Sequence, residues 1–138
     1  MARARKKKPA AKKAPKLTFN HAMIYVRNVG PAMAFYAALG FQLIAQFPGY
    51  ARMRAPQGDA TIALHQIGGT VTTVAAEGIR LYFEVKNLET FCKRLAAGGV
   101  VFSQLPKVMP WGWQHAYLND PDGHEVSLYW AGAKRLRG

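Results

Sequence analysis

Three histidines are the residues of this sequence best suited to proton transfer or metal binding. His21, His65 and His115 each titrate near neutral pH, so each is a candidate general base. Imidazole nitrogens also ligate divalent metals, and two or three of these histidines could together hold one metal ion. No Ser-His-acid or Cys-His pattern with a defined spacing accompanies them. Cys92 lies in a predicted helix and is interpreted as a packing residue.

Arg80 has two interpretations that the sequence leaves open. A guanidinium in an aromatic site suits a planar anion, such as a carboxylate or phosphate, through two parallel hydrogen bonds. In that case we expect a small aromatic or amphipathic anion that is held by Arg80 and stacked on Trp113. Replacement of Arg80 by alanine is then expected to weaken binding by about tenfold or more. The alternative is an internal ion pair with Glu84 or Glu125.

Aromatic residues gather after Pro110, where the sequence places Trp111, Trp113, His115 and Tyr117. Aromatic walls with a few convergent polar groups are typical of a small-molecule pocket. The alternative is that the tryptophans cover the end of a sheet as apolar bulk. Both interpretations stay open for Trp111, whereas Trp113 and His115 are assigned to the pocket.

An internal repeat must position these residues. Residues 21–41, HAMIYVRNVGPAMAFYAALGF, align without a gap with residues 80–100, RLYFEVKNLETFCKRLAAGGV, at an offset of 59. Asn28 matches Asn87, and Gly40 matches Gly99. The period is longer than that of a solenoid and only two copies exist, so we expect two similar modules packed as one domain.

Each module is predicted to have the element order βαβββ, which gives an α+β fold. The first, about residues 18–66, should contain a helix between Asn28 and Gly40 and strands at 18–27, 41–47, 50–55 and 60–66. The second, about residues 79–131, should contain a helix at 88–97 with Asn87 as its N-cap, and strands at 80–86, 100–106, 112–119 and 124–131. Asp120 and Asp122 are interpreted as turn formers.

Alternation along the strands divides their side chains between two faces. One uniformly apolar face is expected to pack on the helices: Ile24, Val26, Leu81, Phe83, Val85, Val126 and Leu128. The other face mixes aromatic, charged and hydrogen-bonding groups and is expected to line a cup: His21, Met23, Tyr25, Thr61, His65, Arg80, Tyr82, Glu84, Glu125, Ser127 and Tyr129.

The charge of the chain is concentrated at its two ends. Of 138 residues, the first 16 hold eight of the 19 basic groups and no acidic group, which predicts a disordered basic tail. Residues 133–138 hold three more basic groups, in a basic C-terminal tail. Residues 17–132, the predicted single domain, are close to neutral. Residues 1–16 either form a solvated tail or contact a polyanion such as nucleic acid; in the second case their deletion should abolish salt-sensitive retention on DNA.

Composition also bounds the location of the chain. No apolar run approaches 18 residues, so we expect no membrane span. The N-terminal residues lack the apolar stretch of a secretory signal. A single cysteine cannot form an internal disulfide, and a cytoplasmic location is the simplest expectation.

Three segments together carry a family resemblance: FNHAMIYVRNV at residues 19–29, FYAALGF at 35–41 and LNDPDGHEVSLYW at 118–130. Over about residues 18–131 the chain resembles the vicinal-oxygen-chelate superfamily, which includes glyoxalase I, bleomycin-resistance proteins, fosfomycin-resistance thiol transferases and extradiol dioxygenases. The resemblance implies paired βαβββ modules that form one curved, cup-like mixed sheet with helices outside. It also implies a homodimer.

The same resemblance implies where a metal would bind. Metal-dependent members place ligands on the first and last strand of each module, at positions that match His21, Ala63, Arg80 and Ser127 here. Of these side chains only His21 is a good ligand, because alanine has no donor atom, arginine keeps its proton, and serine binds divalent ions poorly. A catalytic metal usually has about three protein ligands. We therefore expect that the usual metal site is lost and that no metal cofactor is needed.

Three functions follow from these features. The first, favoured by the missing ligands, is a metal-independent protein of the bleomycin-resistance type that binds a small anionic or aromatic molecule in its cup. The second is a lyase or dioxygenase, similar to lactoylglutathione lyase, with a rearranged site for one divalent metal. The third is a nucleic-acid-associated protein tethered by its basic tail. The predicted ligand-binding residues are Arg80, His65, Tyr82, Trp113, His115, Ser127 and Tyr129, with His21 as the one metal-ligand candidate.

Overall fold

The computed structural model describes residues 16–137, so residues 1–15 of the predicted basic tail lie outside the described residues. The first module contains β1 (His21–Val26), α2 (Val29–Ala38), β2 (Gln42–Phe47), β3 (Tyr50–Arg54) and β4 (Thr61–Gln66). The second contains the short 3₁₀ helix η1 (Ala76–Gly78), β5 (Arg80–Glu84), α3 (Leu88–Ala97), β6 (Gln104–Val108), β7 (Gln114–Asn119), β8 (Glu125–Trp130) and a second 3₁₀ helix, η2 (Gly132–Leu136).

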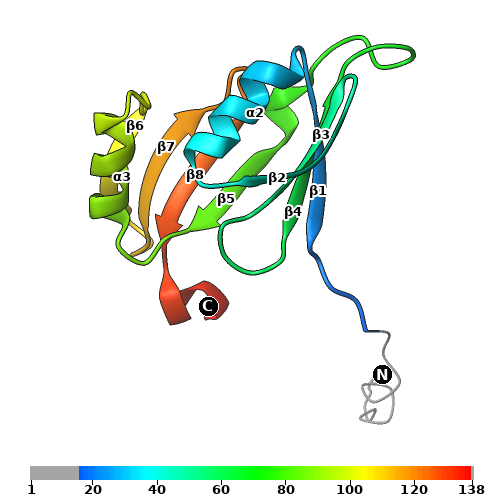
Figure 1. Cartoon of the computed structure of the whole chain (residues 1–138). Coiled ribbons are helices and arrows are strands. Elements are labelled where there is room, and N and C mark those ends of the chain that lie inside the picture. The colour runs from blue at the N-terminus through cyan, green and yellow to red at the C-terminus, as the bar shows by residue number, and fades with distance from the viewer. Residues whose placement is uncertain (1–15, 138) are drawn as a thin grey trace.

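The strands form two four-stranded sheets, one from each module (Figure 1). The strand orders are β1-β4-β3-β2 and β5-β8-β7-β6. In each sheet the first and last strand of the module run parallel, and the other pairs are antiparallel. The predicted α+β fold of paired βαβββ modules is confirmed.

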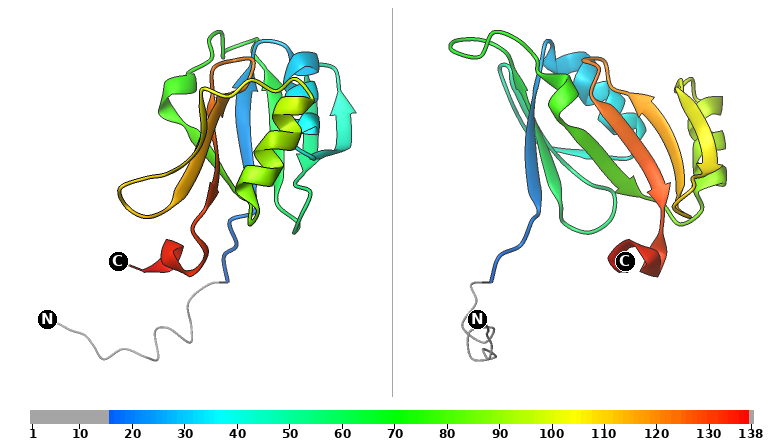
Figure 2. Two further views of the ribbon diagram at one scale, coloured as in Figure 1. Left: turned by 90° about the vertical axis from the view of Figure 1, so that its left-hand side faces the viewer. Right: turned by 180° about the vertical axis from the view of Figure 1, so that it is seen from behind.

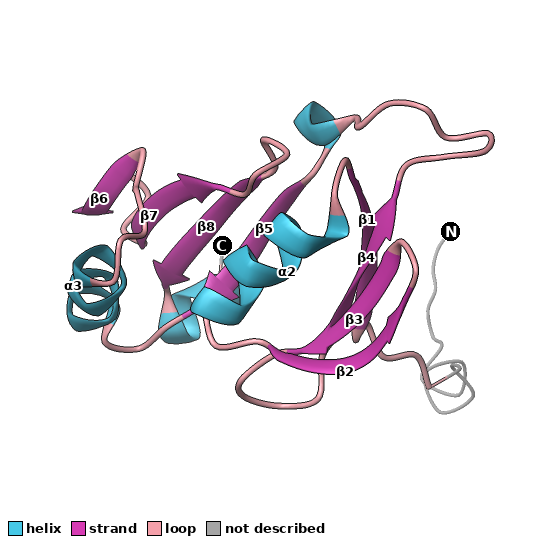
Figure 3. Ribbon diagram, turned by 45° about the horizontal axis from the view of Figure 1, so that its top comes forward, coloured by secondary structure: helices cyan, strands magenta, loops and turns pink. Residues whose placement is uncertain are grey.

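Each helix covers the sheet of its own module. Helix α2 packs on β2, β3 and β4, and α3 packs on β6, β7 and β8. In Figure 3, α2 lies over the junction of the two sheets and α3 lies at the outer side of the second sheet. Strands β1 and β5 approach each other near η1 and diverge toward their other ends (Figures 1 and 2). No helix among residues 16–137 is long and apolar enough to cross a membrane.

The ends of the two helices confirm the repeat. Gly40 follows α2 with a φ of 104°, and Gly99 follows α3 with a φ of 100°. Both glycines stand where the chain must leave the helix in the left-handed region, which disfavours other residues. Asn87 occupies the N-cap of α3 as predicted, but its side chain makes no capping hydrogen bond.

Strand β6 differs from the prediction, which placed it at residues 100–106. It spans Gln104–Val108, and Gln104 lies opposite Tyr117 of β7. In this register residues 100 and 101 lie beyond Asn119, the last residue of β7, and have no strand residue opposite them. Pro106 is tolerated within β6 because β6 is the edge strand of its sheet.

The predicted helix-facing side of the sheets forms the core. Ile24, Val26, Leu81, Val126 and Leu128 are all buried, and Phe83 and Val85 pack against them while partly exposed. Burial of each large apolar side chain stabilises the fold by about 1.5–3 kcal/mol. Cys92 belongs to the same core, and burial raises the pKa of its thiol to about 11, in agreement with a packing role.

The turn between β7 and β8 joins the second module to the first. The Tyr36 hydroxyl of α2 donates a 2.8 Å hydrogen bond to Oδ2 of buried Asp120, and the Arg27 backbone N–H donates a 2.7 Å bond to Asp122. Asp120 also accepts bonds from the backbone N–H groups of Asp122 and His124 and from the His124 ring. Both aspartates therefore form the turn, as predicted, and they also connect the modules.

Candidate functional site

Aromatic rings on the cup face of the second sheet form a continuous stack. The His115 ring lies nearly parallel to three neighbours, at 6.0 Å from Trp113, 5.5 Å from Tyr117 and 5.8 Å from Tyr129. Trp113 and Tyr129 stack on each other at 5.5 Å. Tyr82 of β5 meets His115 and Tyr129 edge-on. We call Trp113, His115, Tyr117 and Tyr129 the aromatic stack. It forms because alternate residues of β7 and β8 point to one face.

Hydrogen bonds fix the protonation of His115. The Trp111 indole N–H can only donate, and it lies 3.3 Å from Nε2 of His115. Nδ1 therefore carries the ring proton and donates it to Oγ of Ser127 at 2.7 Å. His115 and Ser127 are both almost completely buried. Burial lowers the pKa of His115, so its ring is neutral near pH 7.

This arrangement is unsuited to nucleophilic catalysis by Ser127. An activating base must accept the hydroxyl proton of the nucleophile. His115 instead donates its own proton to Ser127, and Trp111 occupies its other nitrogen. Burial also raises the pKa of Tyr129 and Tyr117, so both phenols stay neutral. The hydrogen bonds of buried His115 and Ser127 thus fix the orientation of the aromatic rings.

A cavity of about 370 Å³ separates β1 from β5, and we call it the strand-gap cavity. His21, Thr61, Arg80 and Tyr82 are among its lining residues. His21 Nδ1 is hydrogen-bonded to the Thr61 hydroxyl at 2.6 Å. At the equivalent positions of the second module, Arg80 Nε lies 3.8 Å from a Glu125 carboxylate oxygen. The ion-pair interpretation of Arg80 is thus confirmed with Glu125, although 61% of the Arg80 side chain is exposed.

A second hollow lies at the tryptophan end of the stack. It measures about 500 Å³ and is lined by Trp111, Trp113, Lys134 and Arg137; we call it the tryptophan hollow. Figure 2 shows the β6–β7 loop, which carries Trp111, on the same side of the molecule as η2. The Lys134 ammonium donates a 3.3 Å hydrogen bond to the Gly112 carbonyl and so joins these two segments.

Glu84 holds the first residues of η2 in place. Its Oε2 accepts hydrogen bonds from the backbone N–H groups of Ala131, at 3.1 Å, and Gly132, at 2.8 Å. These contacts turn the chain just after β8, so that Lys134 reaches the tryptophans. Residues that the sequence analysis assigned to a C-terminal tail thus contribute cations to the hollow.

The structure separates Arg80 from Trp113. Arg80 lies opposite Glu125 in β8, whereas Trp113 precedes Gln114, which lies opposite Trp130. Six residues of strand separate these two levels, a distance of about 20 Å. One small ligand therefore cannot contact both side chains. The expectation that a single ligand is held by Arg80 and stacked on Trp113 is not met.

His65 lies apart from the other predicted ligand-binding residues. It is exposed on the first sheet, where its ring meets Tyr25 and Tyr50 edge-on. Tyr25 lies opposite His65 and His21 lies opposite Thr61, so the two histidines are four residues, or about 13 Å, apart along the sheet. Tyr82, Trp113, His115, Ser127 and Tyr129, by contrast, lie together around the aromatic stack.

Comparison with known proteins agrees with this paired-module architecture. A family model described as the glyoxalase/bleomycin resistance protein/dioxygenase superfamily matches residues 18–128. The chain belongs to this superfamily. No curated protein gives a significant match to the sequence of this superfamily member.

Several solved structures share the fold at low sequence identity. A glyoxalase/bleomycin resistance protein/dioxygenase from Nocardioides superposes with a TM-score of 0.71 at 19% identity, covering 91% of each chain. Lactoylglutathione lyase from Agrobacterium tumefaciens gives 0.72 at 16% identity, over 91% of this chain and 100% of the other. TioX from Micromonospora sp. ML1 superposes with a TM-score of 0.66 at 18% identity, covering 82% of this chain and 98% of TioX.

The residues at the superfamily's metal positions do not fit a metal ion. Buried Ala63 offers no donor atom, Arg80 brings a positive charge, and Ser127 is already bonded to His115. Among residues 16–137, no group of three or more His, Cys, Asp and Glu side chains is arranged to hold a metal. His21, His65 and His115 are also too far apart for the rearranged metal site. His21 and His65 are separated by four residues along the first sheet, and His115 belongs to the second sheet.

Sequence reasoning missed three features of the site: Lys134, Arg137 and the hydrogen bond from Trp111 to His115. The cations lie beyond the last strand, where composition alone indicated a tail. Their only sequence signal was a basic cluster that follows directly after a sheet strand. The Trp111 contact depends on the fold of the β6–β7 loop, which strand alternation does not describe.

Proposed function

We propose that the protein binds a small planar aromatic anion in the tryptophan hollow at the end of its cup, without a metal of the usual superfamily kind. One observation carries this proposal. Trp111 is 56% exposed, yet its indole is held by a hydrogen bond to a buried histidine, beside two cations. An exposed ring in a fixed orientation loses little entropy when a ligand stacks on it.

Each side chain of the hollow has a distinct part in binding. Trp111 and Trp113 supply flat surfaces for stacking, and Lys134 and Arg137 attract the anionic group. The neutral His115 keeps Trp111 oriented. Because no described group near the ligand is set up as a nucleophile, we favour sequestering or sensing of the molecule over its chemical conversion.

Ligand titrations test this function. We use 2-naphthoate and its uncharged isostere 2-naphthamide, and follow tryptophan fluorescence and calorimetric heat. Naphthoate should bind with higher affinity than naphthamide. Trp113→Ala and the double change Lys134→Gln with Arg137→Gln should each weaken naphthoate binding by about tenfold or more.

Arg80→Gln is the matched control, because it removes a cation about 20 Å from the hollow. It should change naphthoate affinity by less than about twofold. A loss of binding in Arg80→Gln with no loss in the Lys134 and Arg137 variant would place the anion in the strand-gap cavity and overturn the tryptophan-hollow proposal.

Elemental analysis distinguishes binding from the metal-dependent alternative. The tag-free protein is expressed with Zn, Ni, Mn and Fe supplied in turn. We expect well below one metal ion per chain, because only His21 among the four matched positions is a good metal ligand. About one metal per chain, lost in His21→Ala, would instead support a lyase or dioxygenase with a rearranged site.

A further inference from the structure

A cavity of about 400 Å³ opens on the helix side of the molecule, where the two modules meet. Its walls come from the end of α2, the β3–β4 turn, β5, α3 and β8, and include Leu39, Phe41, Gln57, Phe83, Phe91 and Leu128. It adjoins the strand-gap cavity, with which it shares Phe41 and Phe83. We call it the helix-side cavity. The tryptophan hollow shares none of its residues.

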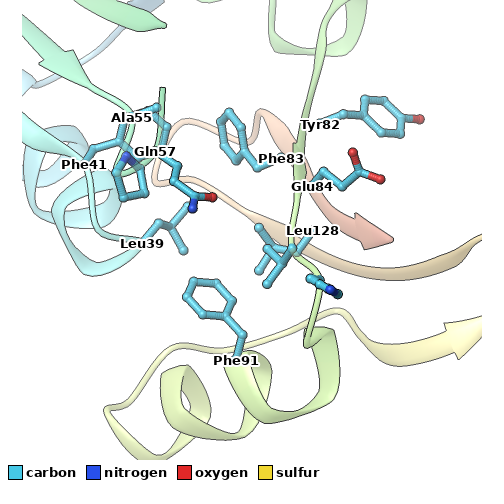
Figure 4. A pocket seen from close by; sticks show the side chains of 12 residues that line it. Leu39, Phe41, Ala55, Gln57, Tyr82, Phe83, Glu84, Phe91 and Leu128 are labelled. Atoms are coloured by element: carbon cyan, nitrogen blue, oxygen red, sulfur yellow. The ribbon is translucent and has the colours of Figure 1, made fainter. Parts of the chain in front are cut away.

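The walls of this cavity are mostly carbon. Figure 4 shows Phe83, Phe91 and Leu39 directed toward the space between the modules. Phe41 and Phe83 meet edge-on at 5.1 Å. Phe83 and Phe91 are only partly buried although they pack against the core, so apolar surface faces the open space. Such surface favours an apolar occupant by about 25 cal/mol per Å² removed from water.

Polar groups are few at this cavity, and they restrict the charge of the occupant. The Gln57 side chain extends toward the cavity in Figure 4, whereas Glu84 points away. The Glu84 carboxylate is instead bonded to Ala131 and Gly132. An amide offers one acceptor and two donors but no charge. The lining also includes Lys86, but this residue is exposed to solvent at the rim of the cavity. An ionised group placed against the carbon walls would therefore lose its hydration without a buried charge to match it.

We propose that the helix-side cavity is a second small-molecule site, which takes a compact, uncharged aromatic molecule with one hydrogen-bonding group for Gln57. The volume lies within the range of small-molecule pockets. The edges of the surrounding phenylalanine rings favour the face of another ring. This ligand class differs from the anion proposed for the tryptophan hollow.

Strand β5 would couple this site to the cup. Phe83 faces the helix-side cavity, whereas Tyr82 points to the opposite side of the strand (Figure 4). Tyr82 in turn contacts His115 and Tyr129 of the aromatic stack. A ligand that fixes Phe83 is therefore expected to change affinity at the stack, and the reverse effect must be of equal size.

Indole is the probe for this proposal, because it is an uncharged aromatic with a single N–H donor. Methyl NMR spectra of the full chain report on Leu39 and Leu128, and calorimetry gives the affinity. Indole should shift both leucine signals. Indole-2-carboxylate, the charged probe, should not shift them at the same concentration.

Two substitutions at one exposed position separate blocking from hydrogen bonding. Gln57→Trp fills the mouth of the cavity and should weaken indole binding by about tenfold or more, while Gln57→Leu removes only the amide and should weaken it by about threefold to tenfold. His65→Ala, on the exposed face of the first sheet and outside both sites, should change it by less than about twofold. Absence of indole binding, an unchanged affinity in Gln57→Trp, or indole-induced shifts at the aromatic stack without shifts at Leu39 and Leu128 would each overturn the proposal.

Discussion

On the first sheet Tyr50 of β3 lies opposite His65 of β4, and on the second sheet His115 of β7 lies opposite Tyr129 of β8. These two rungs are equivalent in the repeat, and each pairs one histidine with one tyrosine. In the first module the rings meet edge-on at 6.1 Å and the histidine is exposed. In the second they are nearly parallel at 5.8 Å and the histidine is buried.

The difference arises outside the strands. Trp111, in the β6–β7 loop, donates a hydrogen bond to His115 and covers it. The equivalent connection between β2 and β3 is a tight turn, Pro48–Gly49, which has no aromatic residue to place over the first sheet. One backbone plan thus produces an open face and a covered face, because the loop beside each sheet determines its exposure. The substitutions below, together with a change of pH, test this comparison.

Asp120→Ala should have the largest effect, because it acts on the connection between the two modules. The change leaves the Tyr36 hydroxyl, the His124 ring and two backbone N–H groups without their acceptor. We expect a loss of about 3–5 kcal/mol in the free energy of unfolding, measured by urea denaturation.

Tyr36→Phe is its milder control, since it removes one hydroxyl and keeps the ring. It should cost about 1–2 kcal/mol. If Asp120→Ala were no worse than Tyr36→Phe, the turn would not be the main polar connection between modules.

His115→Ala and His65→Ala compare the two faces directly. His115→Ala leaves buried Ser127 and the Trp111 indole without a partner, so it should destabilise the fold by about 2–4 kcal/mol. His65→Ala, on the exposed face, should change stability by less than about 0.5 kcal/mol. Thermal unfolding of the two variants measures the difference, and equal effects would contradict the distinction between a covered and an open face.

Mild acid should destabilise the covered face through His115. Burial lowers the pKa of His115 in the folded chain, so near and below pH 6.5 the unfolded chain binds more protons at this residue than the folded chain. The His115 contribution to stability is therefore complete above pH 6.5 and is lost as the pH falls toward its folded pKa. Unfolding measured from pH 7.5 to pH 5 should show a smaller pH dependence in His115→Asn than in the unchanged protein. Parallel curves would exclude His115 as the source.

Arg80→Ala should have only a small effect on stability. The contact with Glu125 spans 3.8 Å and is largely exposed, and such pairs contribute about 0–1 kcal/mol. Chemical denaturation at low and high salt measures this contribution. A loss above about 2 kcal/mol would show that Arg80 has a structural role beyond a surface ion pair.

Local sequence patterns predicted the fold well because its elements depend on local chemistry. The matched glycines predicted where both helices end, and α3 has the predicted bounds of 88–97. Alternation predicted the buried face of β1, β5 and β8. Strand β6 was misplaced because its bounds depend on how it pairs with β7, including a register shift between Gln104 and Lys107, which local composition does not show.

The candidate site was predicted less completely because it depends on how strands pair. Counting by twos assigned Arg80 and Trp113 to one face, but only the pairing shows that they lie at opposite ends of that face. The cations Lys134 and Arg137 reach the tryptophans through a turn that Glu84 holds from another strand. Homodimer formation and a polyanion contact of residues 1–16 stay predictions.

The polar connection between the modules occupies one end of their boundary, and this has a mechanical consequence. Arg27, which directly follows β1, and Tyr36 of α2 contact the β7–β8 turn. In Figure 2 this turn lies at the end where β1 and β5 converge. Where those strands diverge, the boundary holds cavities. The molecule therefore resembles a hinge. Its pivot, the hydrogen-bonded β7–β8 turn, is stiff, and its jaws, the diverging ends of β1 and β5, are more easily deformed. Amide hydrogen exchange should be slow at the pivot and faster along the jaws, and a molecule bound between the jaws should slow exchange there first.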